Sequence, residues 1–352
     1  MIDKDGYKPN QVVWEITLKC NLKCSHCGSS AGEERLNELT TKEALKVCND
    51  LAEIGFRGIG LMGGELFLRK DWDVITKEIK DLGMAVSTVT NGFFDPDKII
   101  PKLVDLQVDC VTVGFDGTEK IHDQIRGVKG SFQKALDFMR AAKAAGLITN
   151  PITTVHKMNF HDIKNLTNLI LDEEGLDWQI QEAVPIGRFD KKLGLSEEEI
   201  YSLAVFIASL QKKYSKDRVI GGHSLGFHSQ FLPDLSFYPE WKGCYAGRSV
   251  LGVRSDGAVK GCEILPDEYI EGNVRKRSII DIWNDPNSFA YNRKFKKEDL
   301  GPNCKGCKHG ENCKGGCMAR SVIMTNKPHN ESHCFYRIEQ KLSLKNNRIF
   351  FS

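Results

Sequence analysis

The chain has 352 residues, 41% of them hydrophobic, which is enough to bury one large domain and a smaller one. A formal net charge of +2 argues against a protein that binds nucleic acid through a strong positive field, and Arg275-Lys276-Arg277 is expected to be a solvated surface. No apolar run reaches membrane-spanning length, and the first residues carry no signal core. We therefore expect a cytoplasmic protein with neither a membrane nor a nucleic-acid partner.

Strand-like and helical segments alternate along the first 214 residues. One helix is expected from a capping box at Thr40 and Glu43 to a stop at Gly55, and another begins at a second capping box, Ser196 with Glu199. This alternation predicts a parallel sheet with right-handed crossovers, which curl it toward a barrel. The predicted strands cover residues 12–18, 58–63, 84–90, 108–115, 147–156 and 176–184.

Three cysteines follow the first predicted strand in the spacing CxxxCxxC: Cys20, Cys24 and Cys27. Twelve cysteines in a chain without a secretion signal indicate metal ligands before disulfides. A structural zinc site is normally closed by four ligands, whereas an iron–sulfur cluster held by three cysteines leaves one iron open. For this motif alone, zinc or a redox thiol remains the alternative.

The sequence Gly63-Gly64-Glu65 ends the second predicted strand. Two glycines let the backbone approach a ligand closely, and a neighbouring carboxylate can hold an ammonium group. With this motif added to CxxxCxxC, the chain resembles the radical S-adenosylmethionine (SAM) superfamily. Leu66 departs from the proline that usually follows the motif in that family.

The resemblance implies an α/β fold, an open (β/α)6 partial barrel of the TIM type. It also implies that Cys20, Cys24 and Cys27 hold a 4Fe-4S cluster, that SAM chelates the open iron, and that the Gly-Gly-Glu segment binds the methionyl amine. Asn91-Gly92 and Asp116-Gly117 at two strand ends could equally be simple turns. Gly114 replaces a serine of several relatives. The SAM-binding residues expected from the resemblance are Gly63, Gly64, Glu65, Thr90, Asn91, Asp116, Arg126 and His26.

The strand–helix alternation stops after residue 214, and seven more cysteines follow. Their spacing is C-x12-G-x4-C, a gap, C-x2-C-x5-C-x3-C, and a final cysteine, which resembles the SPASM extension of radical SAM enzymes. Zinc ribbons are the alternative for this second set. We expect three regions: a radical SAM core over 1–190, a helical connector over 191–240 and a SPASM domain over 241–352.

Members of the SPASM group hold two auxiliary iron–sulfur clusters, and the resemblance divides the second cysteine set between them. The first cluster is one cysteine short, so substrate or another residue would complete it. Cys48 and Cys110 remain and are expected in the core. The first cluster takes Cys244, Cys262 and Cys317, and the second takes Cys304, Cys307, Cys313 and Cys334.

The resemblance implies reductive cleavage of SAM to a 5′-deoxyadenosyl radical, with the auxiliary clusters accepting an electron from the substrate. We expect a ribosomally made peptide or protein as substrate, oxidised by a crosslink, a thioether or a dehydrogenation. The oxidation releases a proton, and Glu263 matches the position of a general base in sulfatase-maturing relatives. The alternative is that Glu263 is a surface residue.

Two other functions remain open from the sequence. The first is oxidation or rearrangement of a small molecule, such as a sugar alcohol or a tetrapyrrole side chain. The second is an iron–sulfur scaffold or electron carrier, which is disfavoured because a carrier has no use for a SAM site. The first strand is expected within about a dozen residues of the start, so we expect a separate leader-recognition protein for a peptide substrate. The expected electron donor is a flavodoxin or ferredoxin.

Overall fold

The computed structural model describes residues 8–222, 225–232, 235 and 241–349. Within these residues, no helix is long and apolar enough to cross a bilayer. The chain forms two compact units, each of which combines separate stretches of sequence. The first unit contains residues 1–151, 186–189 and 245–295, and the second contains 152–185, 190–244 and 296–352. The three regions expected from the sequence divide the chain by function rather than into compact units. They remain a prediction.

The sheet of the first unit is parallel at its centre. Its strand order is β10-β9-β8-β1-β2-β3-β4, in which β1 pairs in parallel with both β2 and β8. A hairpin joins β8 to β9, and β10 continues it in antiparallel. The strands are β1 (Gln11–Thr17), β2 (Gly58–Gly63), β3 (Ala85–Thr90), β4 (Cys110–Gly114), β8 (Val250–Val253), β9 (Ala258–Lys260) and β10 (Ile270–Asn273).

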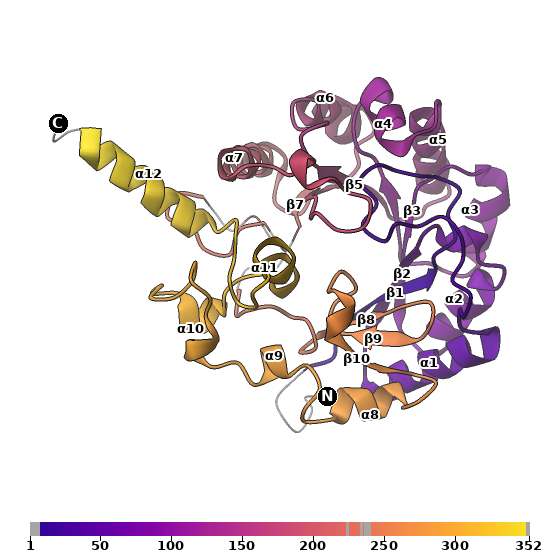
Figure 1. Ribbon diagram of the computed structural model, residues 1–352. Coiled ribbons are helices and arrows are strands. Elements are labelled where there is room, and N and C mark those ends of the chain that lie inside the picture. Colours follow the sequence, from indigo (N-terminus) through magenta and orange to yellow (C-terminus); the bar gives the residue numbers. More distant parts are fainter. Residues whose placement is uncertain (1–7, 223–224, 233–234, 236–240, 350–352) are drawn as a thin grey trace. The chain divides into compact units, whose positions relative to one another are not determined.

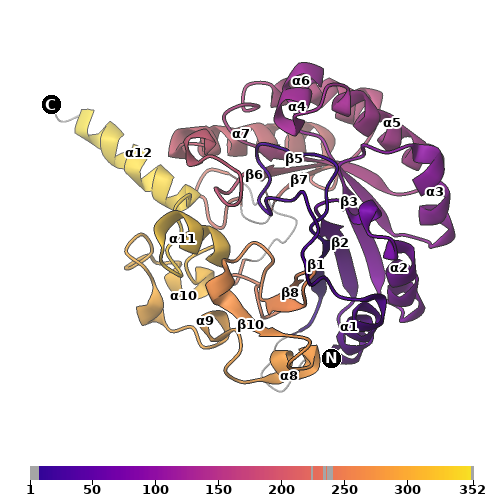
Figure 2. The same ribbon diagram turned by 45° about the vertical axis from the view of Figure 1, so that its right-hand side comes forward.

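Amphipathic helices follow the parallel strands of this unit. The helix α1 has both hydrogen bonds of the predicted capping box at Thr40 and Glu43, and it ends at Gly55 in the left-handed conformation. Figures 1 and 2 show α1, α2, α3 and α5 along the outside of β1 to β4. The helices are α1 (Thr41–Ile54), α2 (Trp72–Asp81), α3 (Pro96–Asp105), α4 (Glu119–Arg126), α5 (Ser131–Ala144), α8 (Ile279–Asn284) and α9 (Ala290–Arg293).

The second unit continues the strand–helix series and contains the later cysteines. Its strands β5, β6 and β7 pair in parallel, although β5 begins in the first unit. The second predicted capping box, Ser196 with Glu199, is present at the start of α7. The elements are β5 (Thr149–Val155), α6 (Ile163–Thr167), β6 (Trp178–Glu182), α7 (Glu197–Tyr214), β7 (Val219–Gly221), α10 (Gly310–Cys313), α11 (Met318–Thr325) and α12 (Phe335–Ile349).

The predicted fold class is confirmed. Each of the six predicted strands coincides with one of β1 to β6, with ends that differ by one or two residues. The chain also forms the β8–β9 hairpin around Ser255-Asp256-Gly257 and the helix α8. Parallel strands of this kind place their carboxyl ends on one side, where the chemistry of barrel enzymes lies.

Candidate functional site

The three cysteines after β1 lie on one loop, and each sulfur has an N–H neighbour. The backbone N–H of Leu22 is 3.5 Å from Cys20 Sγ, and that of Ala31 is 3.4 Å from Cys27 Sγ. Arg126 Nη1 lies 3.9 Å from Cys24 Sγ. Hydrogen bonds to sulfur and nearby positive charge stabilise thiolates and tune the clusters they hold. The donor set therefore fits a cluster with one open iron.

Burial raises the pKa of two of these thiols. It raises the pKa of Cys20 to about 11, with smaller contributions from the charges of Glu65, Cys24 and Cys27, so the three thiols lie close together. Burial also raises the pKa of Cys24, against the opposing charge of Arg126. Among the described residues, no three His, Cys, Asp or Glu side chains converge on a point that a single ion could occupy. A four-iron cluster binds each cysteine through a different iron, so its ligands need no such convergence.

The Gly-Gly-Glu segment follows β2, and its glutamate is hydrogen-bonded to residues at the end of β3. The Glu65 carboxylate is fully buried and accepts hydrogen bonds from Thr90 Oγ1 at 2.9 Å and from the Asn91 N–H at 2.8 Å. Burial raises the pKa of Glu65 to about 7 even though these hydrogen bonds oppose the shift. The carboxylate thus fixes the turn after β3, which carries two of the expected SAM-binding residues.

The two glycines of this segment lie against the backbone at the end of β1. A Cβ on Gly63 would overlap the carbonyl oxygen of Thr17, and one on Gly64 would overlap the carbonyl of Lys19. This close approach of two backbone segments requires glycine at both positions, and the expected approach to a ligand stays a prediction. It holds the segment against the start of the cysteine loop.

Asp116, Arg126 and His26 form a buried group beside Cys24. Arg126 Nη2 is 2.7 Å from Asp116 Oδ2, and His26 Nε2 is 3.3 Å from the same oxygen. Burial lowers the pKa of His26, so its imidazole is neutral at pH 7. His122 Nδ1 accepts the N–H of Asp116 at 3.1 Å. The structure thus brings together expected SAM-binding residues from the segments that follow β1 and β4 and from α4.

The segment after β6 contributes a residue that sequence reasoning undervalued. Arg188 Nη1 donates to the carbonyl of Ala31 at 2.6 Å, and its Nε donates to that of Cys24 at 3.2 Å. Gly187 has a φ of 60°, and a Cβ there would overlap the carbonyl of Gly28. This Pro-x-Gly-Arg segment therefore braces the cysteine loop. The motif was the only signal for it in the sequence.

Glu263 is buried, so its interpretation as a surface residue is wrong. Its Oε1 lies 3.8 Å from Lys260 Nζ, and Oε2 has no hydrogen-bond partner among the described residues. Burial raises the pKa of Glu263 to about 8, and Lys260 opposes that shift. With a pKa of about 8 the carboxyl is largely protonated at pH 7, and its ionised fraction, which grows as the pH rises toward 8, can accept a proton.

The later cysteines of the second unit form two groups. Burial raises the pKa of Cys304 to about 11, with smaller contributions from the charges of Glu331, Cys334 and Cys307. The pKa of Cys313 is raised by burial and by Cys334. The expected ligands of the second auxiliary cluster are therefore neighbours. Cys262 belongs to the first unit.

Cys317 lies beside Cys244 in the same unit, as two expected ligands of the first auxiliary cluster should. Burial raises the pKa of the Cys317 thiol, and Cys244 adds to the shift. The guanidinium of Arg320 opposes it. Cys317 therefore has a thiol neighbour and a cation neighbour in the interior of this unit.

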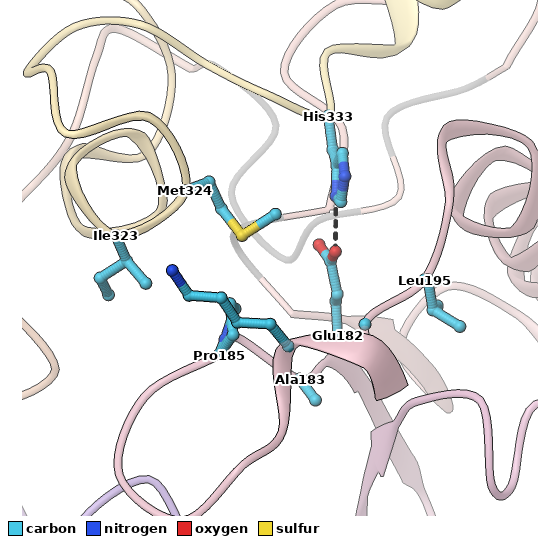
Figure 3. A pocket seen from close by; sticks show the side chains of 9 residues that line it. Glu182, Ala183, Pro185, Leu195, Ile323, Met324 and His333 are labelled. Atoms are coloured by element: carbon cyan, nitrogen blue, oxygen red, sulfur yellow. Dashed lines mark hydrogen bonds and ion pairs between the residues drawn. The ribbon is translucent and has the colours of Figure 1, made fainter.

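A pocket of about 130 Å³ opens at the carboxyl end of β6 in the second unit (Figure 3). Its lining is polar and apolar in similar measure, and its charged or titratable side chains are Glu182, Lys191 and His333. Figure 3 shows Glu182 and His333 facing one another, with 2.6 Å between Oε1 and Nδ1. The other lining residues are Ala183, Pro185, Gly194, Leu195, Ile323 and Met324.

A buried charge network connects this pocket to Cys317. Arg320 Nη1 donates to Glu182 Oε2 at 2.6 Å, and Arg320 Nε donates to Glu331 Oε1 at 2.7 Å. Glu331 Oε2 then accepts the backbone N–H of Cys317 at 3.0 Å. Nothing in the spacing of these residues predicted the network, because its members come from β6, α11 and the loop before α12.

Two family models match the chain. The radical SAM superfamily model matches residues 14–170, and the SPASM model, an iron–sulfur cluster-binding domain, matches residues 244–308. The first match contains the CxxxCxxC and Gly-Gly-Glu motifs. The second match begins at Cys244 and includes Cys262, Cys304 and Cys307.

Individual proteins resemble the chain over most of its length. An AdoMet-dependent heme synthase from Methanosarcina barkeri is 29% identical over 95% of this chain and 98% of its own. The mycofactocin maturase MftC from Mycobacterium ulcerans is 28% identical over 88% of this chain and 83% of its own. The crystal structure of Streptococcus suis SuiB bound to S-adenosylmethionine superimposes with a TM-score of 0.74 at 17% identity, over 93% of this chain and 77% of SuiB. At that identity, the superposition speaks for the fold alone.

Proposed function

Because the chain belongs to the radical SAM superfamily and carries a SPASM domain, we propose that it oxidises an organic substrate and passes an electron to an auxiliary cluster. SAM and iron–sulfur clusters are its cofactors, and when bound they supply a 5′-deoxyadenosyl radical and the electron acceptor. The observation that carries this proposal is the presence of two thiol sets. One set has three cysteines beside the Gly-Gly-Glu segment, and the other gathers four cysteines within the second unit.

The protein's own residues position the reaction and receive its proton. Cys20, Cys24 and Cys27 would hold the first cluster, and Arg126 keeps a positive charge beside Cys24. The substrate would lose one hydrogen atom to the radical, then one electron to an auxiliary cluster and one proton to a base, a loss of two hydrogens in total. We propose Glu263 as that base, which its burial and its unpaired Oε2 support.

The first substrate class that we propose is a tetrapyrrole with carboxylate side chains. The heme synthase relative supports it, because the match extends over nearly the full length of both chains. The pocket at β6 also suits a short aliphatic arm ending in a carboxylate, since Leu195 and Ile323 give it apolar surface and Lys191 supplies a cation. At about 130 Å³ it is smaller than the pockets of roughly 300–1,000 Å³ that enclose whole ligands. We therefore propose that it holds one arm of the substrate.

A peptide is the second proposed substrate class. MftC and a PqqA peptide cyclase from Bradyrhizobium diazoefficiens, which is 26% identical over 90% of this chain, support it. A peptide carboxylate would find the same cation in the pocket. A separate leader-recognition protein belongs to this second proposal, and a flavodoxin or ferredoxin as electron donor belongs to both.

The two classes are separated by an anaerobic assay with reconstituted enzyme, SAM and a reductant. We would add iron coproporphyrin, metal-free coproporphyrin or a protease-sensitive peptide fraction from host extract. The readouts are 5′-deoxyadenosine above its background, and the loss of two hydrogens from the substrate, with or without CO2. A tetrapyrrole response supports the first class, and a response abolished by protease supports the second. If no added substrate raises 5′-deoxyadenosine, both classes are wrong.

The matched pair Lys191→Met and Lys192→Met tests the pocket. Both lysines are exposed neighbours, but only Lys191 lines the pocket. We expect Lys191→Met to raise the KM for a carboxylate substrate at least tenfold and Lys192→Met to leave it unchanged. Equal KM values in the two variants would rule out the proposed carboxylate contact.

A further inference from the structure

Arg320 is a buried cation that donates hydrogen bonds to two carboxylates and has one further donor atom without a partner among the described residues. Only 1% of its surface is exposed. Its Nη1 and Nε donate to Glu182 and Glu331, as described above. Its Nη2 is also buried, and among the described residues no atom accepts a hydrogen bond from it. An unpaired donor on a buried guanidinium is costly, so it calls for a partner beyond the described residues.

The surroundings of Arg320 indicate the nature of that partner. Glu182 and Glu331 are already paired with the guanidinium, and the Phe227 ring lies 5.6 Å from its Cζ. A further neighbour is the Cys317 thiol, whose charge interacts with Arg320 and with Cys244. A partner beside two cysteines that accepts a hydrogen bond from a cation is a thiolate or sulfide of a metal cluster.

The energetic cost of the network supports a functional reason for it. Glu182, Arg320, Glu331 and His333 are each less than one-tenth exposed. Buried ion pairs of this kind are often no more stable than apolar side chains of the same volume. Stability alone therefore does not explain why two carboxylates, a guanidinium and an imidazole lie together in the interior. Second-sphere hydrogen bonds to metal ligands are a common reason for such groups.

We propose that Arg320 Nη2 donates a hydrogen bond to a sulfur of the auxiliary cluster held by Cys317 and Cys244, and that Arg320 thereby raises its reduction potential. Hydrogen bonds to sulfur and positive charge stabilise the reduced state of an iron–sulfur cluster, because reduction adds negative charge. A higher potential makes the cluster a better acceptor for the substrate's electron. Arg320 is thus a positioning residue that acts on the electron acceptor.

Glu182 connects this effect to the pocket. It lines the pocket (Figure 3). It also accepts a hydrogen bond from Arg320, so it partly neutralises the guanidinium. Removing the negative charge of Glu182 leaves the cation of Arg320 less compensated. Loss of Arg320 and loss of the Glu182 charge should therefore change the cluster potential in opposite directions.

The test is a potentiometric titration of the anaerobic holoenzyme followed by electron paramagnetic resonance. The reduction step that disappears in Cys317→Ala, together with the iron of one cluster, identifies the cluster in question. If Cys317→Ala keeps its iron, the ligand assignment in the proposed function fails, and the role of Arg320 fails with it. If the iron is lost, the potentials of the Arg320 and Glu182 variants decide the role of Arg320 by itself.

We expect Arg320→Gln to lower this reduction potential by at least about 59 mV. For one electron, that shift corresponds to a tenfold change in the equilibrium constant. Glu182→Gln, which keeps the shape of the side chain, should raise the potential. Arg218→Lys is the control, because Arg218 pairs with the surface residue Asp177. The other two clusters are internal references and should not change.

Arg320→Gln leaves two buried carboxylates without their cation and could prevent folding. Arg320→Lys keeps the charge but loses the fork geometry that serves three acceptors. We expect Arg320→Lys to fold and to lower the potential by less than Arg320→Gln. The proposal is overturned if Arg320→Lys and Glu182→Gln leave the potential unchanged, if both move it in the same direction, or if all three clusters shift together.

Discussion

Arg126 Nη2 lies 2.7 Å from Asp116 Oδ2, and the guanidinium occupies the space that a side chain on Gly114 would need. A Cβ at position 114 would overlap Nη2. The glycine at this position, which departs from the serine implied by the resemblance, therefore has a physical reason in this chain. In this chain, β4 has no side chain at position 114, and the Arg126–Asp116 ion pair beside Cys24 fills that volume.

Gly114→Ala should therefore displace Arg126 from Asp116. Both residues are buried, and separating a buried ion pair costs roughly 3–5 kcal/mol. We expect a loss of about 3 kcal/mol in the free energy of unfolding, measured by urea denaturation. Gly32→Ala is the control, because a Cβ at Gly32 meets no atom within 4 Å. Equal stability of the two variants would show that the guanidinium moves aside at no cost.

Glu65 predicts a pH dependence of stability. Burial raises its pKa from 4.5 to about 7, so the native state keeps a proton that the unfolded chain loses between these values. The free energy of unfolding should fall as the pH rises from 4.5 to 7, by about 3 kcal/mol in total. Glu65→Gln retains an acceptor for the Asn91 N–H and should flatten this part of the profile. A profile identical to that of the unchanged protein would contradict the buried state of this carboxyl.

Iron content distinguishes cluster ligands from core cysteines. Cys24→Ala should lose the roughly four irons of one cluster after anaerobic reconstitution. Cys48→Ala is the matched control, because Cys48 is buried on α1, where burial raises its pKa to about 12. We expect full iron content in Cys48→Ala. If its iron fell as far as that of Cys24→Ala, iron loss would report general unfolding instead of ligand removal.

Glu263→Gln tests the proposed base. If Glu263 takes the substrate proton, the variant should still cleave SAM, but product formed per 5′-deoxyadenosine should fall by about 10²-fold. The exposed Glu268, in the same segment, provides the control Glu268→Gln. Unchanged product yield in Glu263→Gln would remove this role. The carboxyl would then be a buried group that only packs near Lys260.

Local sequence patterns were sufficient to predict the helices and strands, and the cysteine spacing can be read directly from the sequence. Capping residues at Thr40 and Ser196 predicted two helix starts, because both depend on neighbours within three residues. The CxxxCxxC and Gly-Gly-Glu motifs likewise occur in short segments. What these motifs could not supply was the reason for Gly63 and Gly64, which depends on the backbone after β1.

The rest of the site depends on contacts between distant segments. Arg188 reaches the cysteine loop across more than 150 residues of sequence, and Arg320 meets Glu182 across 138. No periodicity or spacing relates such positions, so they had to come from the structure. The burial of Glu263 is of the same kind, because it follows from the packing of β8 and β9 around it.

The most direct test of the separate roles of the two thiol sets is 5′-deoxyadenosine formation in three anaerobically reconstituted proteins. These are the unchanged chain, Cys24→Ala and Cys313→Ala. The account predicts that the unchanged chain and Cys313→Ala cleave SAM, that Cys24→Ala does not, and that only the unchanged chain gives oxidised substrate. SAM cleavage that survives in Cys24→Ala, or full product formation in Cys313→Ala, would contradict the division of labour between the two thiol sets.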